Sequence, residues 1–389
     1  MTSPDTLLGA LPGPPDFTYD WGALTATPIG GLLHRLSRTQ QNPALHGEGD
    51  VAVHTRMVCD ALTAMPGFRS LPDMPRRALA LAALLHDLGK LSTTRPEEGQ
   101  WVSPGHSAAG AHMARELLWR DFGLCGTPER QGLRETVCGL IRCHMLPVHI
   151  LDREEPERRL TRLAADAQLN SGFSVALMCM LAEADIRGRL CADSAVLLET
   201  VALCRETAAE AGCLHGPRFF ADSYTQRAYF QGRSVWQDQA LYDDTWGWVT
   251  LLSALPGTGK DTWTAAHAAD MPVISLDQLR GVMGVSPTEA QGRVVQAAQE
   301  QARIHLRAHQ PFLWNATNLT QATRQKLVTL CEGYGASVRM VYLETDWEEN
   351  LRRNAERKAG VPEPVITSML GKLSPPQRWE ARQVDWQCV

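Results

Sequence analysis

The sequence predicts two domains, an all-α domain followed by an α/β domain with a parallel sheet. Its 389 residues exceed the usual size of a single compact core. Between residues 51 and 205, apolar residues recur every three or four positions, as they do on the buried faces of helices. After Thr245, short apolar runs alternate with helical segments, which is the order of a parallel sheet covered on both faces. We therefore expect 1–235 to form the helical domain with a helical extension, and 236–389 to form the α/β domain.

The helical pattern of the first domain consists of six segments, separated by turns that contain proline or glycine. Each segment has helical apolar spacing and few β-branched runs. The expected helices span residues 51–65, 75–91, 106–119, 129–143, 173–187 and 193–211. A polar and aromatic stretch at 222–244 follows them, and we expect it to be a linker.

Four apolar runs in the second domain predict buried strands. They span residues 248–252, 272–275, 311–314 and 337–343. In a parallel sheet with helical crossovers, ligands bind at the carboxyl ends of the strands. The residues that follow each of these runs are therefore the first candidates for a site.

Composition and charge are typical of a folded soluble protein. Hydrophobic residues make up 44% and charged residues 21% of the chain, which argues against disorder. The net charge of -5 provides no global basic field for nucleic acid, although it leaves room for a local basic patch. The first residues lack a signal-peptide pattern, and the longest apolar runs are shorter than a membrane span. We expect a cytoplasmic protein without membrane contact, and the ten cysteines, which include no Cys-x-x-Cys pair, should be reduced.

A phosphate-binding loop follows the first expected strand. It reads Ala254-Leu255-Pro256-Gly257-Thr258-Gly259-Lys260-Asp261-Thr262, close to the common Gly-x-x-x-x-Gly-Lys-Ser/Thr pattern. Small residues let backbone N–H groups converge on phosphate oxygens, and the lysine would reach the β- and γ-phosphates of a nucleotide. A carboxylate replaces the usual hydroxyl after the lysine, and carboxylates also bind Mg²⁺. The expected nucleotide-binding residues are Gly257, Thr258, Gly259, Lys260, Asp261 and Thr262.

An aspartate and an arginine follow the second expected strand. Asp277 and Arg280 lie three residues apart, on one face of a helix. The aspartate can accept the proton of an attacking hydroxyl, while the arginine fixes a phosphate or the acceptor. Taken alone, such a pair is more often a helix cap beside a solvated arginine.

Together these motifs resemble the phage-type 5′-OH polynucleotide kinases. The set includes Asn315-Ala316-Thr317-Asn318 after the third strand and Arg353-Asn354-Ala355-Glu356-Arg357 in a late helix. The resemblance implies that Asp277 is the general base toward a 5′-hydroxyl and that Arg280 contacts the acceptor. It also implies that Lys260 acts on the phosphates of ATP or another NTP with Mg²⁺, and that Arg353 and Arg357 stabilise the transferring phosphoryl group. The family often has an acidic residue where this chain has Asn315.

A second set of functional residues lies in the first domain, on or beside the expected helices. It consists of His54, His86-Asp87, His106, His144 and Asp185. Imidazole and carboxylate ligands of this number can hold two transition-metal ions, with Asp87 able to bridge them. Taken singly, each histidine would more often be an ordinary core or surface residue.

The order His, His-Asp, His, His, Asp resembles that of the HD phosphohydrolases. The match rests on Leu84-Leu85-His86-Asp87-Leu88-Gly89-Lys90 and Ala184-Asp185-Ile186-Arg187-Gly188-Arg189. The resemblance implies two ions such as Mn²⁺, Co²⁺, Ni²⁺, Cu²⁺ or Zn²⁺, held by His54, His86, Asp87, His106, His144 and Asp185. His46 either faces a substrate phosphate or caps a turn. Lys90 and Arg187 either supply charge that binds phosphate or are exposed to solvent.

An HD hydrolase followed by a polynucleotide kinase is the arrangement of the bacterial HD-Pnk family of RNA end-healing enzymes. The resemblance covers most of the chain, from Gln40 to Leu373. It implies that the first domain removes 2′,3′-cyclic phosphate and terminal 2′/3′-phosphate from RNA, and that the second phosphorylates 5′-OH ends of RNA or DNA. A separate RNA ligase would seal the ends, because the chain has no Lys-x-Asp-Gly motif.

Two other classes of protein fit the same residues. One is a bifunctional small-molecule enzyme that joins a nucleotidase to a nucleoside kinase. The other is a regulatory nucleotide-binding module in which the first domain is a scaffold.

Overall fold

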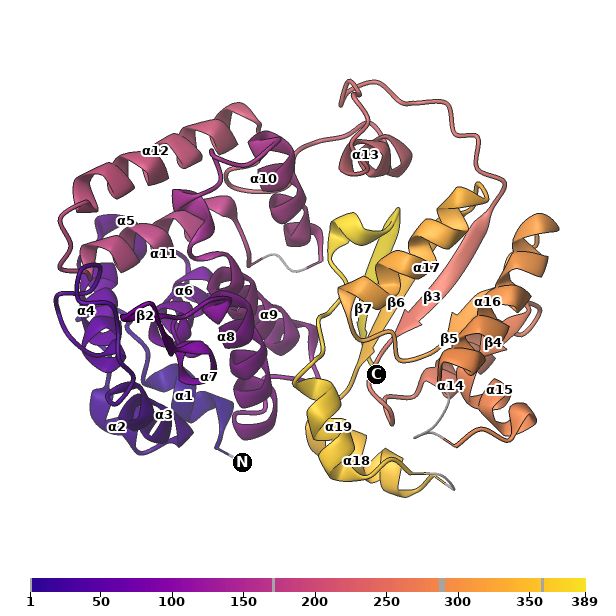
Figure 1. The fold of residues 1–389 in the computed structure, drawn as a ribbon, viewed down its shortest axis with the longest axis horizontal. Helices are drawn as coiled ribbons and strands as arrows, with labels where there is room; N and C mark the ends of the chain where they lie inside the picture. The colour runs from indigo at the N-terminus through magenta and orange to yellow at the C-terminus, as the bar shows by residue number, and fades with distance from the viewer. Residues whose placement is uncertain (1, 170–171, 287–290, 358–359) are drawn as a thin grey trace. The chain divides into compact units, whose positions relative to one another are not determined.

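The computed structural model describes residues 2–169, 172–286, 291–357 and 360–389. Within it the chain divides into two compact units, Met1–Arg218 and Phe219–Val389 (Figure 1). The first unit is helical and the second is an α/β unit with a parallel sheet, which confirms the predicted fold class. The division precedes the expected boundary between 235 and 236.

The first unit consists of helices and one small hairpin. Its helices are α1 (Pro4–Gly9), α2 (Trp21–Thr25), α3 (Pro28–Leu36), α4 (Val51–Ala64), α5 (Pro66–Arg69), α6 (Asp73–Leu85), α7 (Lys90–Thr93), α8 (His106–Glu116), α9 (Pro128–Cys143), α10 (Pro156–Ala165), α11 (Val175–Arg187) and α12 (Ser194–Glu210). Strands β1 (Arg95–Glu97) and β2 (Gln100–Val102) form the hairpin. All six expected helices are present, whereas α1 to α3, α5, α10 and the hairpin were not expected.

Helix α6 lies at the centre of this unit. It contacts α4, α9 and α11, and every residue from Ala78 to Leu85 is buried. A helix that is apolar on all sides belongs in the interior, where its neighbours cover each face. We expected one helix over residues 75–91. The observed helix α6 ends earlier, because the chain leaves it after Leu85 and makes a turn before α7.

The second unit contains a five-stranded parallel sheet with the order β4-β5-β3-β6-β7. Its strands are β3 (Trp248–Ser253), β4 (Val273–Ser275), β5 (Leu313–Asn315), β6 (Ser337–Glu344) and β7 (Gln383–Cys388). The helices are α13 (Ser223–Phe230), α14 (Lys260–His267), α15 (Leu276–Met283), α16 (Gln291–Arg307), α17 (Gln321–Gly333), α18 (Trp347–Ala355) and α19 (Glu363–Leu370). The four expected strands are present, and β7 is an additional edge strand.

The connections of the sheet place the candidate residues together. Central strand β3 is buried over most of its length and ends at the phosphate-binding loop. Strand β5 lies beside it, and β4 lies beside β5 with Ser275 in register with Asn315. The carboxyl ends of these three strands therefore carry the loop, Asp277 and Asn315 at one edge of the sheet.

The segment 222–244, expected to be a linker, belongs to the second unit. Its helix α13 is fixed by Arg227, whose Nε lies 2.6 Å from Oε1 of Glu332 and whose Nη1 donates to the carbonyl of Trp379. Ser223 also accepts a hydrogen bond from Arg382. Among the described helices, none has both the length and the hydropathy needed to cross a membrane.

Candidate active sites

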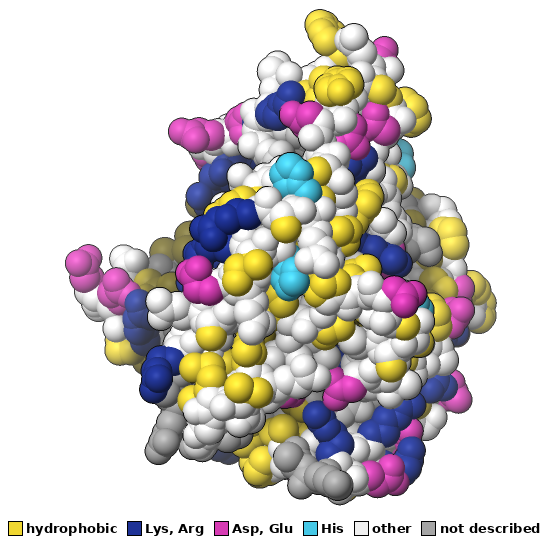
Figure 2. Space-filling model, turned by 90° about the vertical axis from the view of Figure 1, so that its right-hand side faces the viewer, with side chains coloured by type: hydrophobic (Ala, Val, Ile, Leu, Met, Phe, Trp, Pro, Cys, Tyr) yellow, Lys and Arg dark blue, Asp and Glu magenta, His cyan; other side chains and the backbone are white. Residues whose placement is uncertain are grey.

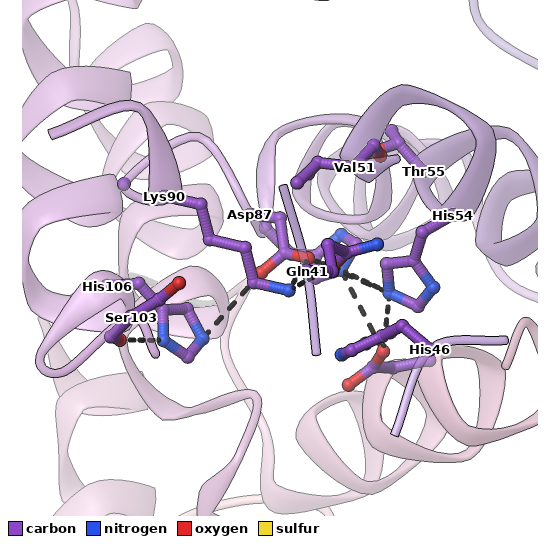
Figure 3. Close-up of polar contacts among 12 residues, drawn as sticks. Gln41, His46, Val51, His54, Thr55, Asp87, Lys90, Ser103 and His106 are labelled. Carbon is purple, nitrogen blue, oxygen red and sulfur yellow. Dashed lines mark hydrogen bonds and ion pairs between the residues drawn. The ribbon is translucent and has the colours of Figure 1, made fainter. Parts of the chain in front are cut away.

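The six predicted metal ligands of the first unit converge from five parts of the chain. His54 comes from α4, His86 and Asp87 from the turn after α6, His106 from the start of α8, His144 from the residue after α9, and Asp185 from α11. All are buried except His106, which is partly exposed. Figure 3 shows His46, His54, Asp87, Lys90 and His106 turned toward a common centre. The packing of α6 against α4, α9 and α11 brings these residues together.

Asp87 is shared between two groups of ligand atoms. Its Oδ2 lies 3.3 Å from Nε2 of His86 and 3.7 Å from Nε2 of His54, while its Oδ1 lies 3.7 Å from Nε2 of His106. One group is His54, His86 and Asp87, and the other is Asp87, His106 and His144. Asp185 joins the first group, with its Oδ1 3.0 Å from Nε2 of His54. This is the arrangement expected of a carboxylate that bridges two ions.

Backbone contacts fix the tautomers of three histidines. His86, His106 and His144 each place Nδ1 2.7–2.8 Å from the backbone carbonyl three residues earlier. A carbonyl can only accept, so Nδ1 carries the proton and Nε2 of the neutral ring holds a lone pair. Nε2 of His106 and Nε2 of His144 are 3.3 Å apart, and two lone pairs at that distance repel unless a cation lies between them. The donor set fits a His/Asp metal-binding cluster.

Burial and charge keep His106, His144 and Asp87 in metal-binding protonation states. Burial lowers the pKa of His144 to about 3 and also lowers the pKa of His106. Burial acts in the opposite direction on Asp87, but Lys90 and the neighbouring histidines hold the pKa of its carboxyl well below the usual value. Neutral imidazoles and ionised carboxylates are the forms that bind metal.

Glu48 is a residue of this cluster that the sequence analysis missed. Its buried carboxylate has Oε1 2.8 Å from Nδ1 of His54 and 2.9 Å from Nδ1 of His46, and Oε2 accepts the N–H of Leu190. Burial alone would lower the pKa of His54, but contacts with Asp185 and Glu48 raise it to about 9. His54 thus has a carboxylate behind it where the other three histidines have a carbonyl.

His46 lies at the cluster and does not cap the following helix. Asp50 caps α4, since its side chain accepts the N–H groups of Ala52 and Val53. Glu48 could have been recognised in the sequence, because it lies two residues after His46 and just ahead of the helix that carries the first ligand.

A cavity of about 620 Å³ opens over the cluster. Asp87, His106 and His144 lie in its wall together with His46, Lys90 and Arg189. Lys90 is buried, with Nζ 2.7 Å from Oδ2 of Asp87. Two cationic side chains beside a metal-binding cluster suit a phosphate group.

Arg189 lines this cavity, whereas Arg187, the arginine expected near the phosphate, does not. Arg187 is half-exposed, pairs with Glu183 and lines a different cavity. Arg189 contacts Asp185, with Nε 3.1 Å from Oδ1. Its spacing of four residues from Asp185 was a signal available in the sequence.

Gly89 allows α8 to approach the turn that holds His86 and Asp87. A Cβ at this position would lie 2.0 Å from the carbonyl oxygen of His106 and 2.5 Å from the N atom of Gly110. We expect Gly89→Ala to displace α8, to cost about 1–3 kcal/mol of folding free energy, and to lower the metal content. Thermal unfolding and metal analysis check this. Gly31→Ala is the control, because a Cβ there meets no atom within 4 Å, and an equal metal content in both variants would contradict the prediction.

The phosphate-binding loop of the second unit has the conformation that its glycines allow. Gly257 and Gly259 have φ values of 83° and 95°, which strain other residues. Lys260 begins α14, and its Nζ donates to the carbonyl of Leu255 at 2.9 Å. Burial lowers the pKa of Lys260 to about 8. The lysine is held over its own loop, where a phosphate group would stabilise its charged form.

The predicted residues Asp277, Arg280 and Arg357 lie around this loop. Asp277 and Arg280 contact each other on α15, and Nε of Arg280 donates to Oε1 of Gln291 at 2.9 Å. Nη2 of Arg357 lies 3.7 Å from Oδ2 of Asp261 and 4.0 Å from Oδ2 of Asp277. The guanidinium of Arg357 therefore faces both carboxylates.

Three further predicted residues lie in or beside the loop. Arg353 pairs with Glu349, and its Nη1 lies 3.6 Å from the place that a Cβ of Gly259 would take. Thr258 is buried and donates to the carbonyl of Leu255, whereas Thr262 is exposed on α14. The predicted kinase residues thus gather at the carboxyl edge of the sheet.

Comparisons with known proteins find one matching family model within each unit. Residues 50–174 match the HD domain family, and residues 249–376 match an AAA domain family. The chain is 42% identical over 80 residues to the multifunctional CCA protein of Halorhodospira halophila, a match that covers 21% of this chain and only 17% of that protein. A gluconokinase from Sinorhizobium meliloti 1021 matches with 19% identity and a TM-score of 0.28, covering 36% of this chain and 82% of the gluconokinase.

Proposed function

Because the chain joins an N-terminal HD domain to a P-loop kinase-like domain, we propose that it heals broken RNA ends. The HD domain removes 2′,3′-cyclic phosphate and terminal 2′/3′-phosphate, and the kinase domain transfers the γ-phosphate of an NTP to a 5′-OH end of RNA or DNA. The observation that carries the proposal is the presence in one chain of a His/Asp cluster and of a phosphate loop whose Asp261 is joined to Asp277 through Arg357. A separate RNA ligase would then seal the healed ends.

In the HD domain, each proposed role follows from position. His54, His86, Asp87 and Asp185 would hold one ion, and Asp87, His106 and His144 the other. Such ions supply Lewis-acid charge and lower the pKa of bound water. Lys90 and Arg189 would bind the phosphate oxygens from the cavity wall. Glu48 would hold the ring of His54 in place from behind.

In the kinase domain, the proposed roles divide between donor and acceptor. Lys260 and Arg357 would neutralise the donor phosphates, with Arg353 beside the loop. Asp277 would take the proton of the attacking 5′-hydroxyl, and Arg280 would position the acceptor. Arg357 faces both the loop and Asp277, which supports a reaction centre between them.

Charges of both signs are mixed on the face of the protein that Figure 2 draws. On the face that Figure 2 shows, basic side chains are interspersed with acidic and apolar ones. The net charge of -5 agrees with this mixture. Proteins that bind along a duplex present a continuous basic stripe.

One experiment tests the proposal at both ends of a strand. A 5′-OH RNA oligonucleotide carrying a 2′,3′-cyclic phosphate is incubated with γ-labelled NTP, and both ends are followed. Label at the 5′ end together with loss of the cyclic phosphate supports the proposal. Nucleosides that outcompete the oligonucleotide would indicate the small-molecule nucleotidase and nucleoside kinase, and NTP binding without turnover would indicate a regulatory module.

The two activities should differ in their metal requirement. Histidine-rich ligand sets prefer Mn²⁺, Co²⁺, Ni²⁺, Cu²⁺ or Zn²⁺, whereas phosphoryl transfer from NTP normally uses Mg²⁺. Metal-stripped protein given Mg²⁺ alone should therefore phosphorylate 5′-OH ends but leave 3′-end phosphates in place. Adding Mn²⁺ or Ni²⁺ should restore 3′-end hydrolysis. Rapid 3′-end hydrolysis with Mg²⁺ as the sole metal would disprove this assignment.

Asp277→Ala should lower kcat of the kinase by about 10²-fold or more, because a general base contributes that much. NTP binding should survive, since the phosphate loop is unchanged. Asp277→Asn should rescue nothing, because an amide cannot take the proton, whereas Arg280→Lys should retain part of the activity if a point charge suffices. Steady-state kinetics with 5′-OH RNA provides the measurement. A wild-type kcat in Asp277→Ala would show that Asp277 is not the general base; it does not cap α15 either, since Ser275 is the cap of that helix.

A further inference from the structure

Two positions that usually hold Mg²⁺ in a phosphate-loop site carry other residue types in this chain. In P-loop enzymes the ion is commonly held by the Ser or Thr hydroxyl beside the loop lysine and by an Asp after a neighbouring strand. In this chain Asp261 follows Lys260, and an amide, Asn315, ends the neighbouring strand β5. The carboxylate is on the loop and the neutral group is on the strand.

The two side chains contact each other directly. Nδ2 of Asn315 donates to Oδ1 of Asp261 at 2.9 Å. A carboxylate oxygen can only accept, which fixes the orientation of the amide. Asn315 is buried at the end of β5, whereas the side chain of Asp261 is 74% exposed. The rigid strand thus holds one oxygen of Asp261, and the other oxygen faces the open site beside Arg357.

Electrostatic repulsion explains why residues 261 and 315 both differ from the common pattern. An aspartate at 315 would place a second carboxylate at hydrogen-bond distance from Asp261, where two negative charges repel. An amide at 315 removes the repulsion and adds a donor. Thr262 is one residue further along α14 and is therefore rotated by about 100° around the helix axis, so it does not take the place of Asp261.

We propose that Asp261 is the protein ligand for the Mg²⁺ of the bound NTP, and that Asn315 positions it. Mg²⁺ in such sites binds one or two carboxylates together with substrate phosphates, so a single carboxylate on the loop suffices. The inference rests on the proposed NTP-dependent kinase function and deepens it, but it does not depend on which acceptor is phosphorylated.

The test measures ATP binding by calorimetry, with and without Mg²⁺, and takes the ratio of the two Kd values. Wild-type protein should bind ATP more tightly with Mg²⁺. Asp261→Ala and the isosteric Asp261→Asn should reduce this Mg²⁺ enhancement by about tenfold or more, the range seen when metal sites lose an orienting or coordinating group. Asp270→Ala removes an exposed carboxylate after the same helix and should retain the enhancement. A wild-type enhancement in Asp261→Asn would overturn the proposal.

A reciprocal exchange tests the role of Asn315. Asp261→Thr supplies a hydroxyl without a carboxylate and should lose most of the enhancement. Adding Asn315→Asp to Asp261→Thr recreates the common hydroxyl and carboxylate pair, and should recover it. If the double variant binds Mg²⁺·ATP no better than Asp261→Thr, Asn315 is not the partner of the metal ligand. Thermal unfolding midpoints near that of the wild type show that each variant is folded.

The binding assay separates this inference from the proposed function. A protein that fails to phosphorylate 5′-OH RNA but needs Asp261 for Mg²⁺-enhanced ATP binding would contradict the polynucleotide acceptor and support the metal ligand. A protein that phosphorylates 5′-OH RNA with equal Mg²⁺ enhancement in wild type and Asp261→Asn would do the opposite.

Discussion

Lys260→Ala should abolish phosphoryl transfer to 5′-OH ends and leave 3′-end hydrolysis at the wild-type rate. Lys260 is the cationic side chain of the phosphate loop and is buried over it, where its charge acts with little screening. Removing one preorganised group that stabilises the transition state costs about 10²–10³-fold in rate. The lysine also contacts the ground-state phosphates, so ATP affinity should fall as well.

Single-turnover transfer of labelled phosphate measures the loss, and hydrolysis of a 2′,3′-cyclic phosphate on the same protein serves as the internal reference. Lys326→Ala is the matched control, because it removes an exposed lysine from α17 in the same unit. If folded Lys260→Ala loses both activities, the proposal of two separate sites fails.

Asp87→Ala should have the reverse effect, loss of 3′-end hydrolysis with an intact kinase. Both oxygens of Asp87 face ligand nitrogens, so one substitution removes a ligand from both groups. It also leaves the buried Lys90 without the carboxylate that lies 2.7 Å from its Nζ. Loss of partners behind a metal ligand costs about 10–100-fold in affinity or activity, and loss of a shared ligand should exceed that.

Metal content and 3′-end hydrolysis are measured on the same preparations. Asp60→Ala, an exposed carboxylate on the helix that carries His54, is the control and should retain both. Full metal content in Asp87→Ala would show that Asp87 does not hold the ions. Loss of kinase activity in a folded Asp87→Ala protein would contradict the separation of the sites.

Elements with strong local signals could be predicted from the sequence. Helices α4, α9 and α11, which were predicted from apolar spacing, lie close to their predicted positions. The same is true of strands β3 and β6, which were predicted from β-type runs. These elements are buried on extended faces, so their pattern repeats over several turns or residues. The hairpin β1–β2 has mostly exposed residues, and no apolar pattern marks it.

The residue types of both candidate sites could also be recognised from the sequence. Ligands such as His86 and Asp87, and the glycines around Lys260, stand in short motifs whose chemistry depends on residues that are adjacent in the chain. The structure brings these predicted residues together. Their assigned roles remain predictions until the variants are measured.

Which neighbouring residues face each site was decided by the tertiary structure alone. A Cβ on Gly188 would lie 2.7 Å from the N atom of Val58, so the chain can turn close to α4 at the end of α11, and Arg189 rather than Arg187 reaches the cavity. The contact between Asp261 and Asn315 joins residues on separate elements through the pairing of β3 with β5. The sequence determined the elements and the chemical groups, because these follow from local spacing. The partners depend on how distant elements pack, which local spacing does not encode.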